Sequence, residues 1–271
     1  MTDRYARFDR LTFDRPAPYV LRLTINNPDK MNALDDTAHH QMECIWAAID
    51  EDPQTRVSIV TGAGRAFCAG GSFEAMPLET PLDANQSFSK GFRDASNLVS
   101  GIVNARKPIV SAINGPAVGA GLAIALLADV PIAARQAKLL DGHLRLGVAP
   151  GDHAAMIWPL LCGMAKAKYF LMTNAAMTGE EAERNNLVAL AVDAAELQDK
   201  ALEVAKQLAA VAPTALRMTK YALNHWLRQS QPVFDLALAF EMVNFSGDEA
   251  KKAMAAMSNK TTADFDDDIK F

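Results

Sequence analysis

An uncharged run of 21 residues, 108–128, constrains the fold of this chain more than any other sequence feature. It is long enough to cross a bilayer, but it contains Asn114-Gly115-Pro116 and two further glycines, Gly119 and Gly121. A helix built from these residues would leave backbone groups without hydrogen bonds in lipid. The run is instead typical of a buried strand, a turn and a buried helix. It therefore predicts no membrane association and a core of strands and helices.

Composition narrows the class of protein further. Half of the 271 residues are hydrophobic and 22% are charged, which is typical of a folded chain of one or two domains. Lys and Arg number 27 against 32 Asp and Glu, and this net charge of −5 argues against a nucleic-acid partner. A local basic pocket for an anionic ligand remains compatible with that charge.

Cysteine usage and the first residues bear on the compartment. The three cysteines are an odd number, and no pair of them has the spacing of metal ligands. They are expected to be reduced thiols, and the first residues lack the apolar segment of a secretory signal. We therefore expect a cytoplasmic protein without a metal site.

Strand and helix patterns alternate along the first 195 residues and predict an α/β core. The predicted strands are 7–13, 19–25, 57–61, 108–113, 130–134, 138–140 and 187–192. Helices are expected after Asp35 or Asp36, over 83–105, over 119–128, after an Asp152 N-cap, and over 165–172. From residue 195 onward the pattern is helical, with breaks at Pro213, Pro232 and Gly247.

Two Gly/Ala-rich turns carry the first chemical signal. Residues 68–71 (Cys-Ala-Gly-Gly) and 118–121 (Val-Gly-Ala-Gly) each follow a predicted buried strand. Small residues let a ligand approach the backbone, and free N–H groups there attract negative charge. Two such turns facing each other would form an oxyanion hole with two donors. Each turn alone is better explained by glycines that only permit a tight bend, and neither matches a dinucleotide or P-loop motif.

Five motifs in order resemble the crotonase superfamily, the enoyl-CoA hydratase/isomerase family, over about residues 5–260. They are residues 27–34 (Asn-Pro-Asp-Lys-Met-Asn-Ala-Leu), 61–71, 107–115, Gly119-Ala120-Gly121, and 146–151 (Leu-Gly-Val-Ala-Pro-Gly). The resemblance implies an α/β fold with a crotonase-like ββα spiral core, residues 1–195, that holds the oxyanion loops. Residues 196–271 would form a helical C-terminal region for oligomerisation and as a pocket lid, within a homotrimer or homohexamer.

The resemblance also implies a substrate and two groups of site residues. The substrate would be an acyl-CoA thioester or a related carbonyl compound, with coenzyme A as part of the substrate and no covalently bound cofactor. The family's oxyanion donors map onto the backbone N–H groups of Gly71 and Ala120. Its coenzyme A cradle maps onto these six residues: Lys30, Asn32, Ala33, Leu34, Ala69 and Phe73.

The two glutamates of the family's hydratases are missing from this sequence. The first would lie two residues after Gly121, where the chain has Ala123, and the second falls in the segment Asp141-Gly142-His143. Hydration needs such acids to position water and to move protons, and alanine cannot transfer a proton. Ordinary enoyl-CoA hydration is therefore not expected.

His143 and Asp152 are the candidate replacements for the two missing glutamates. A histidine is a suitable general base at neutral pH, and a carboxylate on its other nitrogen would fix its tautomer. With no serine or cysteine nucleophile evident, water is the expected nucleophile. This segment is similar to that of the β-diketone hydrolases typified by oxocamphor hydrolase, which cleave a carbon–carbon bond by a retro-Claisen route. That resemblance implies catalytic roles for His143, Asp152 and Glu241, and it matches a further histidine to His39.

Several alternatives stay open. His153 could replace His143 as the base, while His39 and His40 are also compatible with surface positions. A hydratase or isomerase could use Asp152 or Glu74 in place of the missing acids. The chain could also be a CoA-binding subunit without activity. The sequence does not identify the acyl group.

Overall fold

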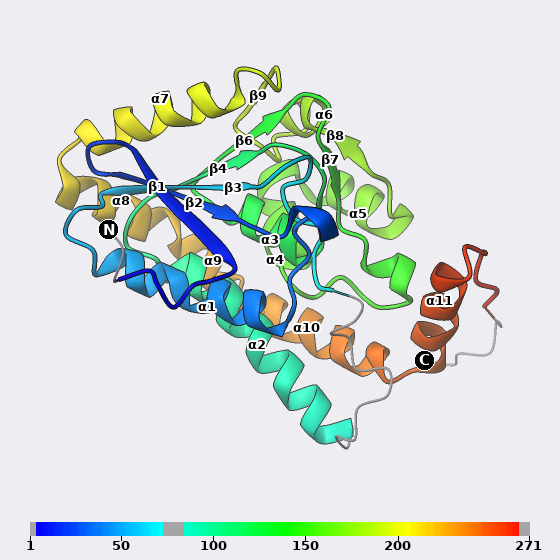
Figure 1. Ribbon diagram of the computed structural model, residues 1–271. Helices are drawn as coiled ribbons and strands as arrows, with labels where there is room; N and C mark the ends of the chain where they lie inside the picture. Colours follow the sequence, from blue (N-terminus) through cyan, green and yellow to red (C-terminus); the bar gives the residue numbers. More distant parts are fainter. Residues whose placement is uncertain (1–3, 73–83, 266–271) are drawn as a thin grey trace.

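The computed structural model describes residues 4–72 and 84–265, and its centre is a six-stranded sheet with the order β1-β2-β3-β4-β6-β9 (Figure 1). β1 and β2 form an antiparallel hairpin, and all later neighbours pair in parallel. Residues of β3 and β4 are buried throughout, as expected for inner parallel strands covered on both faces. The strands are β1 (Leu11–Ala17), β2 (Val20–Ile25), β3 (Val57–Gly62), β4 (Ile109–Ile113), β6 (Val130–Ala134) and β9 (Leu190–Val192).

Helices cover both faces of this sheet. α7 (Leu197–Ala210) lies along one face, and α1 (Asp36–Asp50) and α2 (Ala84–Asn104) lie on the opposite side (Figure 1). The Asp35 side chain caps α1 by accepting a hydrogen bond from the Ala38 N–H at 2.8 Å. The buried side chains form one large core cluster, which includes Trp46 of α1 and Leu238 from the C-terminal helices.

A smaller sheet carries the turns that matter for function. β5 (Ala117–Val118) pairs in parallel with β7 (Lys138–Leu140), which pairs with β8 (Met177–Thr178). β5 leads directly into α3 (Ala120–Leu126), and β7 leads into the short 3-10 helix η3 (His143–Leu146). The elements that follow are α4 (Ala154–Cys162), α5 (Met164–Thr173) and α6 (Gly179–Arg184).

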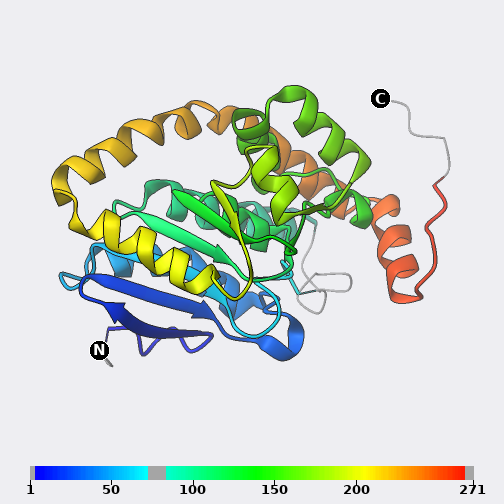
Figure 2. The same cartoon turned by 90° about the horizontal axis from the view of Figure 1, so that it is seen from above.

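The C-terminal part is helical, as the sequence predicts. Figure 2 shows these helices following one another from α7 along one side of the molecule. The division at residue 195 stays a prediction, and α7 packs on the sheet of the first part. Val148, two residues after η3, is buried against Ala250 and Met254 of the last helix. The helices are α8 (Pro213–Leu223), α9 (His225–Gln229), α10 (Gln231–Phe245) and α11 (Asp248–Ser258).

The structure confirms the α/β class and corrects several element boundaries. β1 spans 11–17 rather than 7–13, and it continues through Pro16 because an edge strand tolerates a residue without an N–H donor. The last strand is only residues 190–192, since the Leu187 N–H instead closes α6 on the Ala182 carbonyl at 2.8 Å. Within the described residues, no helix is both long and apolar enough to span a bilayer.

Candidate active site

The two Gly/Ala-rich turns lie directly against each other. The Val118 N–H donates to the Cys68 carbonyl at 3.0 Å, and Cys68 forms an isolated parallel bridge with Ala117. A side chain on Gly121 would begin 2.3 Å from the Cys68 carbonyl oxygen, so only glycine fits there. The sequence expectation that these two turns face one another is therefore met in the fold.

The N–H groups of Gly71 and Ala120 are the candidate oxyanion donors. Ala120 is the first residue of α3, where an N–H has no partner within the helix. Within residues 4–72 and 84–265, neither of these two N–H groups donates a hydrogen bond. A Cβ built on Gly70 would lie 3.8 Å from the Ala120 nitrogen, which places the Gly70–Gly71 peptide beside the start of α3.

The loop predicted to cradle coenzyme A borders the same turn. The Leu34 N–H donates to the Gly70 carbonyl and the Ser72 N–H donates to the Leu34 carbonyl, both at 2.8 Å. The Ala69 N–H donates to Met31 at 3.1 Å. Lys30, Ala33, Leu34 and Ala69 are thus brought to one place, whereas Phe73 lies outside the described residues.

Asn32 plays a structural part in this loop. Its side chain is fully buried and donates to the carbonyls of Ala63 and Ala66, both at 2.8 Å. Its side-chain oxygen accepts the Asn27 N–H at 2.9 Å. The amide therefore holds the loop against the first Gly/Ala-rich turn, and a contact between Asn32 and coenzyme A would have to use its backbone.

His143 lies at the centre of a buried polar cluster. Its Nδ1 is 3.1 Å from Asp141 Oδ2, while its Nε2 faces Asp152 Oδ2 at 3.7 Å and Glu241 Oε1 at 3.6 Å. Its Cε1 lies 3.9 Å from the position a Cβ on Gly119 would occupy, next to the Ala120 donor. The structure thus brings together the three predicted residues His143, Asp152 and Glu241.

The partner of His143 differs from the sequence prediction. Asp141, not Asp152, is within hydrogen-bond distance of Nδ1, and its carboxylate also accepts the His143 N–H at 3.3 Å. A carboxylate only accepts hydrogen bonds, so Nδ1 carries a proton and Nε2 faces the other two acids. Asp141 precedes His143 by two residues in a tight turn, a spacing that could have identified it.

Asp152 is likewise placed differently from its predicted role as an N-cap. α4 begins after His153, and no side chain caps it. Instead, Asp152 Oδ1 is 2.5 Å from His153 Nδ1. His153 Nε2 is in turn 3.3 Å from the indole nitrogen of Trp158, one turn further along the chain.

Glu241 reaches the cluster from α10, 89 residues after Asp152 in the sequence. Gly151 makes this approach possible, since a Cβ there would lie only 2.5 Å from Glu241 Oε2. Glu241 Oε2 and Asp141 Oδ1 are both buried without a hydrogen-bond partner in the described part of the chain. Such groups are costly unless a ligand or water satisfies them.

Two acids of the cluster have pKa values shifted in opposite directions, so that Asp152 is ionised and Glu241 is largely neutral at pH 7. Burial raises the pKa of Glu241 to about 8, and the charge of Asp152 adds to this effect against the opposing influence of His143. Burial also works to raise the pKa of Asp152, but interactions with His153 and His143 lower it to about 2. Neighbouring carboxyl groups with opposite shifts are typical of acid–base sites.

The pKa of His143 shifts in the direction that favours its charged form. Burial alone would lower it, but the carboxylates of Asp152 and Asp141 outweigh burial and raise it well above the ordinary value of 6.5. In the free site at neutral pH, His143 is therefore the cation between two carboxylates. It becomes a base as the pH rises.

The described residues favour neither a bound metal ion nor a thiol nucleophile at this site. Asp141, Asp152 and His153 place ligand atoms within 4.8 Å of one another, but both ring nitrogens of His153 already have hydrogen-bond partners. Burial raises the pKa of the fully buried Cys68 to about 12, so this thiol is not a nucleophile. Water remains the nucleophile that the described residues favour.

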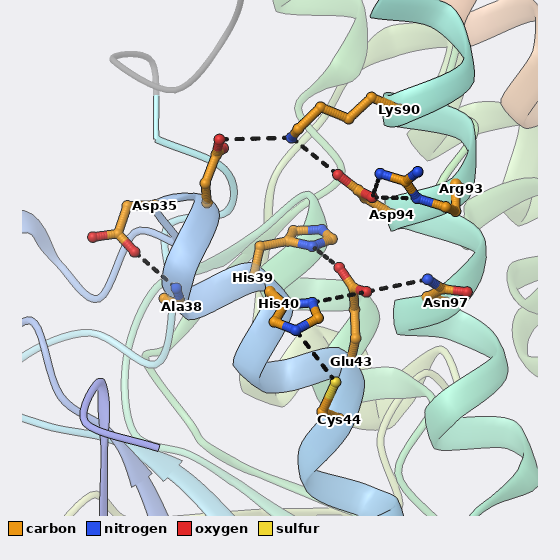
Figure 3. Close-up of polar contacts among 11 residues, drawn as sticks. Asp35, Ala38, His39, His40, Glu43, Cys44, Lys90, Arg93, Asp94 and Asn97 are labelled. Carbon is orange, nitrogen blue, oxygen red and sulfur yellow. Dashed lines mark hydrogen bonds and ion pairs between the residues drawn. The ribbon is translucent and has the colours of Figure 1, made fainter. Parts of the chain in front are cut away.

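His39 and His40 belong to a separate cluster between α1 and α2 (Figure 3). His39 Nδ1 is 3.0 Å from Glu43 Oε1, and His40 lies 3.7 Å from the Cys44 sulfur. Asn97 of α2 donates to the same glutamate at 3.2 Å. This cluster joins two helices, and the match of His39 to a further catalytic histidine stays a prediction.

Comparison with known structures and sequences defines the class of protein. The fold is that of the crotonase superfamily: a crystal structure of an enoyl-CoA hydratase/isomerase from Mycobacterium paratuberculosis matches with a TM-score of 0.83 and 30% identity, over 91% of this chain and 97% of that one. Residues 17–268 match the family model for enoyl-CoA hydratase/isomerase, and the chain belongs to this family of enzymes.

Two relatives of similar sequence are both named as hydratases. The short-chain-enoyl-CoA hydratase of Clostridium acetobutylicum is 32% identical over 89% of this chain and 92% of its own length. The (E)-benzylidenesuccinyl-CoA hydratase of Thauera aromatica is 34% identical over 75% of this chain and 78% of its own length. Both names specify a CoA thioester as substrate.

Proposed function

We propose that this enzyme hydrolyses a carbon–carbon bond in a β-keto acyl-CoA, with His143 activating the water. One observation carries the proposal: beside the Ala120 donor, His143 Nε2 lies 3.7 Å from Asp152 Oδ2 and 3.6 Å from Glu241 Oε1. These separations exceed direct hydrogen bonds and suit a shared water. The names of the relatives favour a thioester over a free diketone.

The attack step uses the sites in which His143 has lost its Nε2 proton, a fraction that grows as the pH rises. Asp141 holds the His143 Nδ1 proton, so the free Nε2 of neutral His143 can take a proton from water while Asp152 Oδ2 accepts its second hydrogen. The water oxygen bonds to the β-keto carbon, and the carbonyl electron pair moves onto its oxygen. His143 becomes an imidazolium, stabilised by the two adjacent carboxylates.

The cleavage step uses the two Gly/Ala-rich turns. The tetrahedral oxyanion re-forms a carbonyl and breaks the bond between the α and β carbons, whose electron pair passes into the thioester as an enolate. The N–H groups of Gly71 and Ala120 stabilise the enolate oxygen. Neutral Glu241, or the imidazolium, returns a proton to the α carbon. The balance is β-keto acyl-CoA plus water giving a carboxylic acid and a shortened acyl-CoA.

Hydration of an enoyl-CoA is the second candidate, favoured by the activities for which the relatives are named. Neutral Glu241 and ionised Asp152 could serve as the acid and base of a hydratase. Ala123, at the position of the family's first glutamate, is fully buried in α3 and supplies no proton. Glu74, the other substitute predicted from the sequence, lies outside the described residues.

Two substrates separate these functions. Crotonyl-CoA tests hydration, by loss of the conjugated thioester absorbance, and acetoacetyl-CoA tests hydrolysis, by release of acetate and acetyl-CoA. We expect turnover of acetoacetyl-CoA that falls by at least about 10²-fold in H143A and D152N, since each removes part of the base. D193N, which changes an exposed aspartate outside the cluster, is the matched control for D152N.

Each result has a clear meaning. Turnover in H143A or D152N within a few-fold of wild type contradicts the mechanism. Efficient crotonyl-CoA hydration with no cleavage favours the hydratase. Saturable protection by acetyl-CoA against thermal unfolding, with no turnover of either compound, favours a CoA-binding subunit without activity.

We also infer that the chain works as a homotrimer or homohexamer, in the cytoplasm. The C-terminal helices expose large apolar side chains, which typically mark a protein interface. The most exposed of these are Met218, Tyr221, Leu223, Trp226, Leu236, Phe240 and Val243. Light scattering on the purified chain tests this inference, and a monomer at micromolar concentration would contradict it.

A further inference from the structure

Next to Asp152 lies a pair of buried rings, those of His153 and Trp158. His153 is fully buried and Trp158 nearly so, with 0% and 1% of their surfaces exposed. The indole Nε1 lies 3.3 Å from His153 Nε2, and His153 Nδ1 lies 2.5 Å from Asp152 Oδ1. These contacts form a chain from tryptophan to histidine to aspartate.

The chemistry of the end groups fixes the direction of both hydrogen bonds. An indole N–H only donates, so His153 Nε2 must accept and carries no proton. A neutral imidazole then has its proton on Nδ1, which points at the carboxylate of Asp152. Both ring nitrogens are thereby used, so His153 is not placed to act as a base.

We propose that His153, held in one tautomer by Trp158, is a positioning residue that orients Asp152 toward His143. The N–H of His153 binds Oδ1 and leaves Oδ2 facing His143 Nε2 at 3.7 Å. Without that bond, the carboxylate could rotate and pair directly with His143, closing the space that the water needs. The role in catalysis rests on the proposed function, whereas the tautomer and the orientation do not.

The first test measures where the proton is. Two-bond ¹⁵N–¹H correlation spectra of the full chain, with ¹⁵N-labelled histidine, distinguish the two tautomers and the cation. We expect His153, assigned by its absence in H153N, to show the pattern of the Nδ1-protonated tautomer. In W158F, which keeps an aromatic ring but removes the donor, Nε2 becomes free to bind a proton. A cationic or Nε2-protonated His153 in the wild type overturns the proposal.

The second test measures the orientation of Asp152 through its effect on His143. H153A frees the carboxylate to approach His143, so the His143 titration midpoint should rise by about half a unit or more. H153N keeps an N–H donor near the place of Nδ1, so it should restore the wild-type midpoint. An unchanged midpoint in H153A, with intact folding by circular dichroism, overturns the positioning role whatever the enzyme's substrate is.

Turnover of acetoacetyl-CoA supplies the catalytic readout. H153A should lower kcat about 10–100-fold and W158F about tenfold, with KM unchanged, and H153N should recover most of the loss. An equal loss in H153A and H153N would show a packing role only. If the wild type does not cleave acetoacetyl-CoA, the proposed reaction fails, while the two spectroscopic tests still decide the tautomer and the orientation.

Discussion

Replacing Asp141 by asparagine tests the electrostatics of the site without removing a hydrogen bond. The amide oxygen of asparagine can still accept from His143 Nδ1, now 3.1 Å from the Asp141 carboxylate, but the negative charge is gone. A hydrogen bond to a charged group contributes about 1.5–3 kcal/mol and a neutral one about 0.5–1.5 kcal/mol. The difference, about 1–1.5 kcal/mol, corresponds to about one pKa unit.

The expected result is a lower pKa for His143 in D141N. Asp141 is one of the carboxylates that raise the pKa of His143 above 6.5, so its neutralisation removes part of that shift. Histidine NMR titration measures the change directly. The acid limb of kcat/KM for the cleaved thioester should move to lower pH by the same amount, because the imidazole would become a free base sooner.

Stability gives a second readout with a defined sign. Since the folded pKa of His143 lies above its ordinary value of 6.5, its stabilising contribution is complete below pH 6.5 and is lost as the pH rises through the folded pKa. D141N should therefore destabilise the protein more at about pH 6 than at about pH 9. D193N is the control for a lost surface carboxylate. A His143 titration unchanged or raised in D141N would refute this reasoning.

Three further predictions concern the other parts of the site. A120P removes one oxyanion donor at the first position of α3, where proline is tolerated. We expect kcat to fall about 10²–10³-fold with little change in melting temperature. A loss of kcat under threefold would exclude the Ala120 N–H as a donor. E241Q removes a carboxyl group whose pKa in the folded protein is about 8, above the ordinary 4.5. The wild type loses stability as the pH rises from 4.5 to 8, and E241Q should keep that stability. Melting curves at about pH 5 and pH 9 measure this, and an unchanged pH dependence contradicts it. K30A should raise KM about fivefold for a CoA thioester but not for its pantetheine analogue, because an exposed lysine contributes about 1 kcal/mol to phosphate binding. An equal effect on both substrates, or the same effect in the control K206A, would argue against Lys30 as part of the coenzyme A cradle.

Local sequence patterns predict the backbone features of this protein well. The two Gly/Ala-rich turns follow buried strands, and their glycines are where the turns touch, as Gly121 against Cys68 shows. Helix starts marked by a capping side chain, such as Asp35, are also visible in the sequence. These features depend on a few neighbouring residues, so local physics determines them.

Side-chain partnerships across the site are less predictable. Asp152 has the right residue type and position for an N-cap, but its carboxylate contacts the buried His153 ring instead of the backbone of α4. The role of Asp141 is hard to predict because an aspartate in a turn usually stabilises the turn itself. Glu241 could be linked to His143 only through a family resemblance, since periodicity does not reveal which face of α10 meets a residue 98 positions earlier.

The close approach of Gly151 to Glu241 has an evolutionary consequence. One added methyl group at residue 151 would collide with Glu241 Oε2 and with the Ala237 backbone, and would push α10 away from the cluster. A single glycine-to-alanine step could thus remove the third acid without altering any acid, and the reverse step could admit it. Homologues that gained or lost Glu241 as a member of the cluster would then differ at residue 151, which carries no functional group.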